Sequence, residues 1–290
     1  MSNIVFLNGK FVPEDRAVVS VFDRGFLYGD GLFEVVRVGN GRLFRWAQHL
    51  ERFLHGAAQL NICLPFSPDD MEKAATQLIK KNKLPEALLR LSLSRGVGAR
   101  GYSPRGADSP TFVMTLHPAP KVEVKNPPRW KLVTASNRLP AGDPLARFKN
   151  ANKLPQILAR AEADAAGADE ALLLNTAGRV VEGTTSNLFW VNKETVCTPP
   201  LAAGILPGVT REVVLEICRA LKFPTKEAAP RPGQLLSAQG VFLSMSSWGI
   251  VEAVGLDGRK LRRAACVKTI RGAYEKLLQA ETRAGGGTGA

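Results

Sequence analysis

The chain has 290 residues, 45% of them apolar, and a formal net charge of +13. A chain of this length and apolar content buries one large core or two smaller ones. No apolar run approaches the length of a membrane span, and the first residues lack the basic and then apolar order of a signal peptide. We therefore expect a cytoplasmic protein with no membrane partner.

A metal site and a disulfide framework are not expected. The few cysteines and histidines are scattered along the chain, and no two of them stand at metal-ligand spacing. They are Cys63, Cys197, Cys218, Cys266, His49, His55 and His117. We expect the thiols to be reduced and buried.

The positive charge raises the alternative of a nucleic-acid-binding protein, because basic surfaces bind phosphates without regard to sequence. The Lys and Arg residues are dispersed, however, and the densest basic run, at 259–263, is short and interrupted by Leu261. Nucleic-acid binding needs a basic stripe on a recognisable module. We expect this run to be the solvated start of a helix, and we expect no nucleic-acid partner. The charge suits anionic substrates and a phosphate.

The first part of the chain predicts a domain of strands and helices. Two apolar runs around Asn8-Gly9 are typical of a hairpin. A glycine-rich turn then precedes an alternating strand that contains Phe33, Val35 and Arg37. Apolar spacing predicts helices over 46–60 and 68–81, followed by strands over 87–94 and 111–116.

A glycine-bearing loop with three arginines, Arg95, Arg100 and Arg105, joins the last two of these strands. Arginines on a loop are often only exposed charge, but they also make good clamps for a carboxylate. Arg100 is the first candidate for that role, with Arg95 and Arg105 behind it.

Prolines between 117 and 128 stand in polar surroundings, as in an interdomain linker. We expect a smaller N-terminal α/β domain over 1–120, a linker over 121–129 and a larger C-terminal domain over 130–280. The glycine-rich residues 281–290 are expected to be a disordered tail.

The second domain carries residues that point to a reaction. After a strand over 131–136 come Lys149 and Lys153, then a helix that begins near Pro155, then a hairpin whose second strand contains Glu182. A polar cluster over 184–187 follows. A lysine and a buried carboxylate are what pyridoxal 5'-phosphate needs, because the amine binds its aldehyde covalently and the acid keeps its ring nitrogen protonated.

The run GILPGVTR over 204–211 precedes an amphipathic helix. Free amides and a threonine hydroxyl at a helix start form a cradle for a phosphate, aided by the helix dipole. Ser246 and Ser247 follow a strand over 241–243, either as a simple turn or as further phosphate contacts. A last helix is expected over 263–278.

These segments together resemble the class IV (fold type IV) aminotransferases, which include branched-chain and D-amino-acid aminotransferases and aminodeoxychorismate lyase. DRGFLYGDGLFE, Lys149-x-x-Asn152 before a helix, and GILPGVTR are all similar to motifs of that family. So are DEALLL over 169–174 and the Glu182-Gly183-x-x-x-Asn187-x-Phe189 pattern. The resemblance reaches about residue 278. It implies a two-domain α/β (α+β) fold like that of D-amino-acid aminotransferase, with pyridoxal 5'-phosphate as cofactor.

The resemblance also implies roles for single residues. Lys149, whose spacing matches the family better than that of Lys153, would bind the cofactor and then move the proton at the substrate Cα. The arginine of H-x-x-R, Arg52, would reach the cofactor phosphate. The implied cofactor contacts are Arg52, Lys149, Glu182, Asn187, Val209, Thr210, Ser246 and Ser247. The implied substrate contacts are Tyr28, Phe33, Arg37, Arg95 and Arg100.

The resemblance leaves the reaction open between two classes. The loop Arg95-Gly96-x-Gly98-x-Arg100-Gly101-Tyr102 is similar to that of aminodeoxychorismate lyases, which eliminate pyruvate. Glu34 and Val35 follow Phe33 as in aminotransferases, which favours a transaminase that takes an amino group from a donor to a 2-keto acid. D-amino acids, (R)-amines and branched-chain L-amino acids are all possible donors. A homodimer is implied, with the arginine loop of one subunit reaching the active site of the other.

Overall fold

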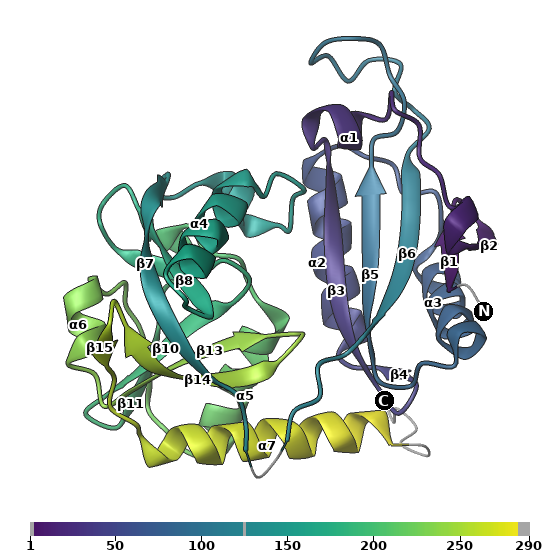
Figure 1. Cartoon of the computed structure of the whole chain (residues 1–290). Coiled ribbons are helices and arrows are strands. Elements are labelled where there is room, and N and C mark those ends of the chain that lie inside the picture. Colours follow the sequence, from purple (N-terminus) through teal and green to yellow (C-terminus); the bar gives the residue numbers. More distant parts are fainter. Residues whose placement is uncertain (1–2, 124–125, 284–290) are drawn as a thin grey trace. The chain divides into compact units, whose positions relative to one another are not determined.

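The computed structural model describes residues 3–123 and 126–283, and the chain divides into two compact units (Figure 1). The first unit runs to Ala119 and adds Phe148–Asn152 and the chain from Leu278 on. The second unit comprises Pro120–Arg147 and Lys153–Leu277. The first boundary lies where the prolines indicate it, but the second domain is not the continuous stretch 130–280 that was expected. Lys149 belongs to the first unit.

The first unit is built on a sheet with the order β2-β1-β6-β5-β3-β4. The strands are β1 (Ile4–Leu7), β2 (Lys10–Pro13), β3 (Gly31–Gly39), β4 (Arg42–Leu43), β5 (Ala87–Ser94) and β6 (Thr111–Pro118). The Asn8-Gly9 hairpin is confirmed, because Leu7 pairs with Lys10 and both turn residues have positive φ. A short 3-10 helix, η1 (Glu14–Arg16), and the helix α1 (Arg24–Tyr28) precede β3.

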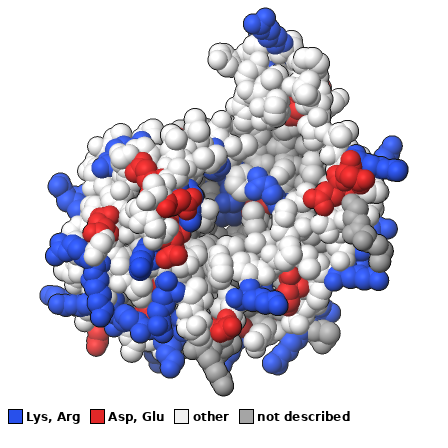
Figure 2. Space-filling view, viewed as in Figure 1, with Lys and Arg blue, Asp and Glu red and all other residues white. Residues whose placement is uncertain are grey.

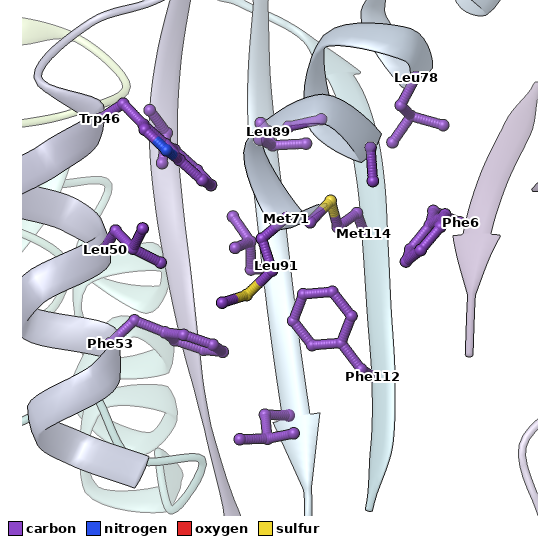
Figure 3. Packing of buried hydrophobic residues seen from close by; sticks show 14 of the residues in the cluster. Phe6, Trp46, Leu50, Phe53, Met71, Leu78, Leu89, Leu91, Phe112 and Met114 are labelled. Atoms are coloured by element: carbon purple, nitrogen blue, oxygen red, sulfur yellow. The ribbon is translucent and has the colours of Figure 1, made fainter. Parts of the chain in front are cut away.

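Helices α2 (Trp46–Gln59) and α3 (Pro68–Asn82) cover one face of this sheet. Every second residue of β5 is buried, because alternate side chains of a strand point to opposite faces. Figure 3 shows the core between sheet and helices, where side chains from α2, α3, β1, β5 and β6 point toward one another. It labels Phe6, Trp46, Leu50, Phe53, Met71, Leu78, Leu89, Leu91, Phe112 and Met114. The residues on the other face, among them Phe33 and Arg90, are only half buried.

The second unit contains a sheet with the order β12-β11-β10-β13-β14-β7-β8-β9. Because β10 also pairs with β9, the strands from β10 to β9 close into a ring. The strands are β7 (Arg129–Leu139), β8 (Glu170–Asn175), β9 (Val180–Gly183), β10 (Asn187–Asn192), β11 (Thr195–Thr198), β12 (Thr225–Glu227), β13 (Gly240–Met245), β14 (Gly249–Leu256) and β15 (Arg259–Lys260), which pairs with β14. The helices are α4 (Leu154–Ala165), α5 (Val209–Ala220), α6 (Pro232–Leu236) and α7 (Ala265–Thr282), with η2 (Pro144–Arg147) and η3 (Leu201–Ala203).

Three local expectations are wrong. The thiols are not all buried, because Cys63 is exposed. The basic run at 259–263 does not start a helix, because Arg259 and Lys260 form β15 after an Asp257-Gly258 turn whose two residues have positive φ. The helix starts only at Ala265. At its other end α7 continues to Thr282, so residues 281–282 are helical rather than part of a tail. The expected tail at 284–290 and residues 124–125 of the expected linker lie outside the described residues.

Figure 2 shows the charged side chains on one face of the molecule, with Asp and Glu side chains between the many Lys and Arg side chains. Within the described residues, no helix is long and apolar enough to cross a membrane. The same residues contain no group of three or more His, Cys, Asp or Glu side chains that could hold a metal ion.

Candidate active site

The backbone around Lys149 is hydrogen-bonded to β3 in the first unit. The Phe33 amide donates to the Lys149 carbonyl at 2.9 Å, and the Ala151 amide donates to the Gly31 carbonyl at 2.9 Å. The Lys149 Nζ lies 4.7 Å from the centre of the Phe33 ring. The lysine is therefore held by an extended segment beside a strand, which fixes where its amine projects.

Gly56 of α2 explains why this segment can lie there. A Cβ at Gly56 would come within 2.9 Å of Leu32 Cδ1 and 3.1 Å of Phe148 Cβ. Contacts of that length are repulsive, so a larger residue on the helix would push away both the strand and the segment that carries Lys149. Phe148 is buried in the gap that the glycine leaves.

A buried carboxylate lies on the helix-facing side of β3. Glu34 Oε1 and Oε2 accept hydrogen bonds from Arg52 Nε at 2.7 Å and Nη2 at 2.8 Å. Burial tends to raise the pKa of Glu34, but the charge of Arg52 and the hydrogen bonds from His49 and Arg52 outweigh it and lower the pKa to about 2. Arg52, expected at the cofactor phosphate, thus also has a partner inside the protein that sequence reasoning missed.

His49 completes this cluster, with its Nδ1 2.9 Å from Glu34 Oε2. Burial lowers the pKa of His49 and outweighs the opposing effect of Glu34, while the charges of Arg52 and Lys149 lower it further. The imidazole is therefore neutral near pH 7. Because Glu34 is ionised, His49 Nδ1 carries a hydrogen and donates a hydrogen bond to the carboxylate.

Arg90 of β5 is a site residue that the sequence reasoning did not name. Its guanidinium lies 4.0 Å from the centre of the Phe33 ring, and it donates a hydrogen bond to Ser92 Oγ at 3.2 Å. Burial lowers the pKa of Arg90, and no acidic side chain in the described part of the chain forms an ion pair with it. Phe33 thus contacts two cations, Arg90 and Lys149. The sequence signal that could have identified Arg90 is the single charged residue in the strand ALLRLSLS.

The other expected substrate contacts lie at different places in the first unit. Tyr28 accepts a hydrogen bond from the Gly101 amide at 3.1 Å. Arg37 binds Glu86 at 2.7 Å and stands four residues along β3 from Phe33, or about 13 Å. The structure therefore does not bring Arg37 together with Phe33.

The two expected loop arginines also differ from each other. Arg95 binds Asp30 through Nε and Nη2 and donates to two main-chain carbonyls, those of Leu60 and Asn61. Arg100 is exposed, and no ion-pair partner for its side chain exists among residues 3–123 and 126–283. Of the two, Arg100 is the one whose charge is available to a ligand.

In the second unit, Glu182 of β9 pairs across the sheet with Asn187 of β10. Glu182 Oε2 accepts from the Leu206 amide at 3.0 Å and from Asn187 Nδ2 at 3.5 Å. Burial lowers the pKa of Lys153, although the charges of Glu182 and Asp143 oppose the shift. The two neighbouring lysines thus differ in setting: Lys149 lies beside β3 in the first unit, and Lys153 near Glu182 in the second.

The polar cluster after Glu182 encloses a different carboxylate. The hydroxyls of Thr184, Thr185 and Ser186 all donate to Glu170, which is 1% exposed. The amides of Thr184 and Thr185 also donate to it. These side chains satisfy a buried acid at the start of β8.

The start of α5 is closely packed. Gly208 is its N-cap, and a Cβ there would lie 1.9 Å from Asn187 Oδ1. The two expected contacts Val209 and Thr210 form the first helical positions and are buried. Ser246 and Ser247 lie half buried in the turn between β13 and β14. Amides at the start of a twelve-residue helix attract an anionic group.

Each unit by itself contains residues whose chemistry fits pyridoxal 5'-phosphate. In the first unit these are Lys149 and Arg52. The second unit contains the other expected cofactor contacts, which include a carboxylate fixed by an amide hydrogen bond and a helix start whose glycine leaves no room for a Cβ. These contacts are Glu182, Asn187, Val209, Thr210, Ser246 and Ser247.

Comparisons with known proteins agree with this chemistry. Residues 31–255 match the family described as amino-transferase class IV. A Methanocaldococcus jannaschii protein assigned as a branched-chain-amino-acid aminotransferase is 34% identical over 97% of both chains. A D-alanine aminotransferase from Bacillus licheniformis is 28% identical over 96% of this chain and 98% of its own. An aminodeoxychorismate lyase from Vibrio harveyi is 32% identical over 82% of this chain and 88% of its own.

Among solved structures, a branched-chain amino acid aminotransferase of T.th. with pyridoxamine 5'-phosphate superposes with a TM-score of 0.91. It is 27% identical, and the match covers 98% of this chain and 96% of that one. The fold type expected from the sequence is confirmed, as is the transaminase interpretation. The protein is an enzyme, and its chain belongs to the class IV aminotransferases.

Proposed function

We propose that this aminotransferase uses pyridoxal 5'-phosphate bound to Lys149 to transfer the amino group of an amino acid to a 2-keto acid. The observation that supports Lys149 is that its backbone is hydrogen-bonded to β3 and its amine lies beside the Phe33 ring. When bound, the cofactor supplies an electron sink for the carbanion that forms at the substrate Cα. Lys149 would then move the proton between the substrate Cα and C4′ of the cofactor.

The other residues orient the reactants. Glu182, already fixed by the Leu206 amide, holds the proton at the ring nitrogen of the cofactor. Arg52 and the start of α5, Val209 and Thr210, hold the phosphate, with Ser246 and Ser247 behind them. Arg100, and Arg90 beside Phe33, bind carboxylates of the substrate. Arg95, which is bonded to Asp30, supports the loop.

The test compares two alanine variants in half-reactions without a keto acid. The visible spectrum of the cofactor-loaded protein is recorded before and after adding D-alanine, L-leucine, L-glutamate or an (R)-arylalkylamine. We expect one donor class to convert the cofactor to its pyridoxamine form, and this names the donor. Lys149→Ala is expected to abolish the conversion with every donor, and Lys153→Ala to retain it. The reverse pattern would assign the cofactor to Lys153.

The second candidate is the lyase reaction, which the Vibrio harveyi relative and the Arg95–Tyr102 loop favour. The residue after Phe33 favours the transaminase, because a glutamate, Glu34, stands there as in aminotransferases. Release of pyruvate from aminodeoxychorismate, with no donor changing the spectrum, would move the assignment to the lyase. A colourless protein that takes up no cofactor and binds nucleic acid with a steep salt dependence would contradict both.

The assembly we propose is a homodimer with a shared active site. Large apolar side chains in the segment before β3 are exposed, among them Phe22 at 66% and Phe26 at 76%. Val18, Val19, Val21 and Leu27 in the same segment are also exposed. Contiguous exposed apolar surface of this kind marks a protein interface. The second copy of this chain is its proposed partner, in a cytoplasmic enzyme.

A further inference from the structure

The loop between β5 and β6 is attached to α1 by one buried arginine. Arg24 is 3% exposed, and its guanidinium donates to three consecutive carbonyls of the loop. Nη1 binds the Gly101 oxygen at 2.9 Å and the Ser103 oxygen at 3.1 Å, and Nη2 binds the Tyr102 oxygen at 3.0 Å. A guanidinium has five N–H donors on three nitrogens, so it can bind three carbonyls and a carboxylate at once, whereas a lysine has three donors on one nitrogen.

Asp30 fixes this guanidinium from the other side. Its Oδ2 accepts from Arg24 Nε and from Arg95 Nε, each at 2.8 Å. Burial tends to raise the pKa of Asp30, but the hydrogen bonds and charges of Arg95 and Arg24 outweigh it and lower the pKa. One carboxylate therefore holds the arginine at the start of the loop together with the arginine of α1.

The backbone at the start of α1 also contacts the loop. The Arg24 amide donates to the Gly96 carbonyl at 2.8 Å, and Asp23 forms a β-bridge with Val97. A Cβ at Gly98 would lie 3.0 Å from Arg24 Cδ and 2.8 Å from Ala107 Cβ, so the loop closes tightly around the arginine stem. The guanidinium also lies 5.0 Å from the centre of the Tyr28 ring.

The part of the loop beyond these anchors is exposed. Tyr102 is 88% exposed, and Arg100 and Arg105 are exposed as well. Within the described parts of the chain, neither of these two arginines has an ion-pair partner. Tyr28 of α1 also contacts the loop: its hydroxyl accepts from the Gly101 amide at 3.1 Å, and its ring meets the Tyr102 ring edge to face with the centroids 5.6 Å apart. The Arg24 guanidinium adds three hydrogen bonds to the loop, so the loop conformation depends strongly on Arg24.

We propose that Arg24 is a positioning residue that locks the 96–106 loop in the conformation in which Arg100 meets the substrate carboxylate. The proposal rests on the proposed function for the role of Arg100. Arg24 itself does not touch the substrate. Losing its fork frees three carbonyls at once, and Arg100 then samples many positions in place of one.

The test uses the loop's own arginines as reporters. Trypsin cleaves after Arg100 and Arg105, and the rate of these two cuts is measured by mass spectrometry on the cofactor-loaded protein. Arg24→Met is expected to raise the rate at least about tenfold, since one lost hydrogen bond of ordinary strength shifts a local opening equilibrium by roughly that factor. Arg24→Lys keeps the charge beside Asp30 but not the fork, so it too should raise the rate. Arg16→Met, at an exposed arginine of the same unit, is the control.

Steady-state kinetics supply the second readout. Arg24→Met should raise the KM for the amino acid as Arg100→Met does, with the spectrum of the bound cofactor unchanged. Wild-type cleavage rates in Arg24→Lys and in a folded Arg24→Met would overturn the lock. An unchanged KM in Arg24→Met would also overturn the lock if Arg100→Met raises the KM. If Arg100→Met leaves KM unchanged, the proposed role of Arg100 fails, and the cleavage rates alone decide whether Arg24 locks the loop.

Discussion

Glu34 and Arg52 form a two-pronged ion pair in the core of the first unit, with oxygen-to-nitrogen distances of 2.7 and 2.8 Å. Strand β3 supplies the carboxylate at a position that would otherwise hold an apolar residue, and α2 supplies the guanidinium. His49 binds the same carboxylate. A charged residue facing a core is tolerated only when its partners satisfy it, so each of the three depends on the others.

The first prediction follows from this pair. Glu34→Gln leaves Arg52 buried without its counter-charge and should lower the free energy of unfolding at pH 7 by about 3–5 kcal/mol. Glu86→Gln, which removes a half-exposed partner of Arg37, should cost no more than about 1 kcal/mol. Urea denaturation measures both. Equal losses in the two variants would contradict the buried role of Glu34.

The pH dependence of the same pair has a defined sign. The folded-state pKa of Glu34, about 2, lies below its ordinary value of 4.5. The pair therefore stabilises the protein fully above pH 4.5, and the stabilisation is lost as the pH falls through about 2. The difference in stability between wild type and Glu34→Gln should shrink over that window. A constant difference would show that Glu34 has an ordinary pKa in the folded protein.

Much of the fold could be predicted because local patterns determine it. The strand expected over 87–94 is β5 with the same bounds, since its alternation matches a sheet with one covered face. The helices expected over 46–60 and 68–81 differ from α2 and α3 by one residue at their C-terminal ends. The basic run at 259–263 does not begin a helix, because the Asp257-Gly258 turn before it favours a hairpin, and charge alone does not indicate a helix.

The site could be predicted only in part, because its remaining features depend on contacts between distant segments. Motif spacing favours Lys149 over Lys153, but nothing local indicates that the Lys149 backbone is hydrogen-bonded to β3, more than a hundred residues earlier. The same holds for Glu34 and Arg52, and for Arg95 and Asp30. A sequence pattern names the residue types that a reaction needs, whereas the fold decides which of them are already paired.

The second prediction concerns Gly208 and the phosphate. A Cβ there would lie 1.9 Å from Asn187 Oδ1, so Gly208→Ala must shift the start of α5. We expect this variant to bind pyridoxal 5'-phosphate at least about tenfold more weakly, since a lost charge-assisted hydrogen bond costs at least that factor. Gly233→Ala is the matched control, because a Cβ there meets nothing within 4 Å. The affinity is measured by adding the cofactor back to cofactor-free protein and following the absorbance. Equal affinities in the two variants would show that the start of α5 does not bind the phosphate.

The third prediction concerns the exposed apolar segment. Phe26→Asp places a charge on a side chain that is 76% exposed, so the fold of one chain should tolerate it while a dimer interface should not. Sedimentation velocity is expected to show a dimer for the wild type and a monomer for the variant. Leu221→Asp, at an exposed leucine just after α5, should leave the dimer intact. A dimeric Phe26→Asp variant would show that the dimer interface lies elsewhere. A monomeric wild type would contradict the proposed dimer.

The fourth prediction concerns Arg90. Its guanidinium stacks on Phe33, is partly buried and has no acidic partner among the residues described, so its charge is available to an anionic group beside Lys149. Arg90→Met should therefore raise the KM for donors or acceptors with a second carboxylate, such as L-glutamate, by about tenfold or more, as expected for one lost charged hydrogen bond. The KM for L-leucine should change little, because it has no second carboxylate to lose.

The comparison between the two substrates makes the Arg90 test specific. A general disturbance of the sheet would raise both KM values and lower kcat for both, whereas a lost carboxylate partner affects one substrate selectively. Arg90→Lys should restore part of the binding of L-glutamate, since the charge remains but the stacked planar group is lost. Equal changes for L-glutamate and L-leucine in Arg90→Met would mean that Arg90 supports Phe33 and does not select the substrate.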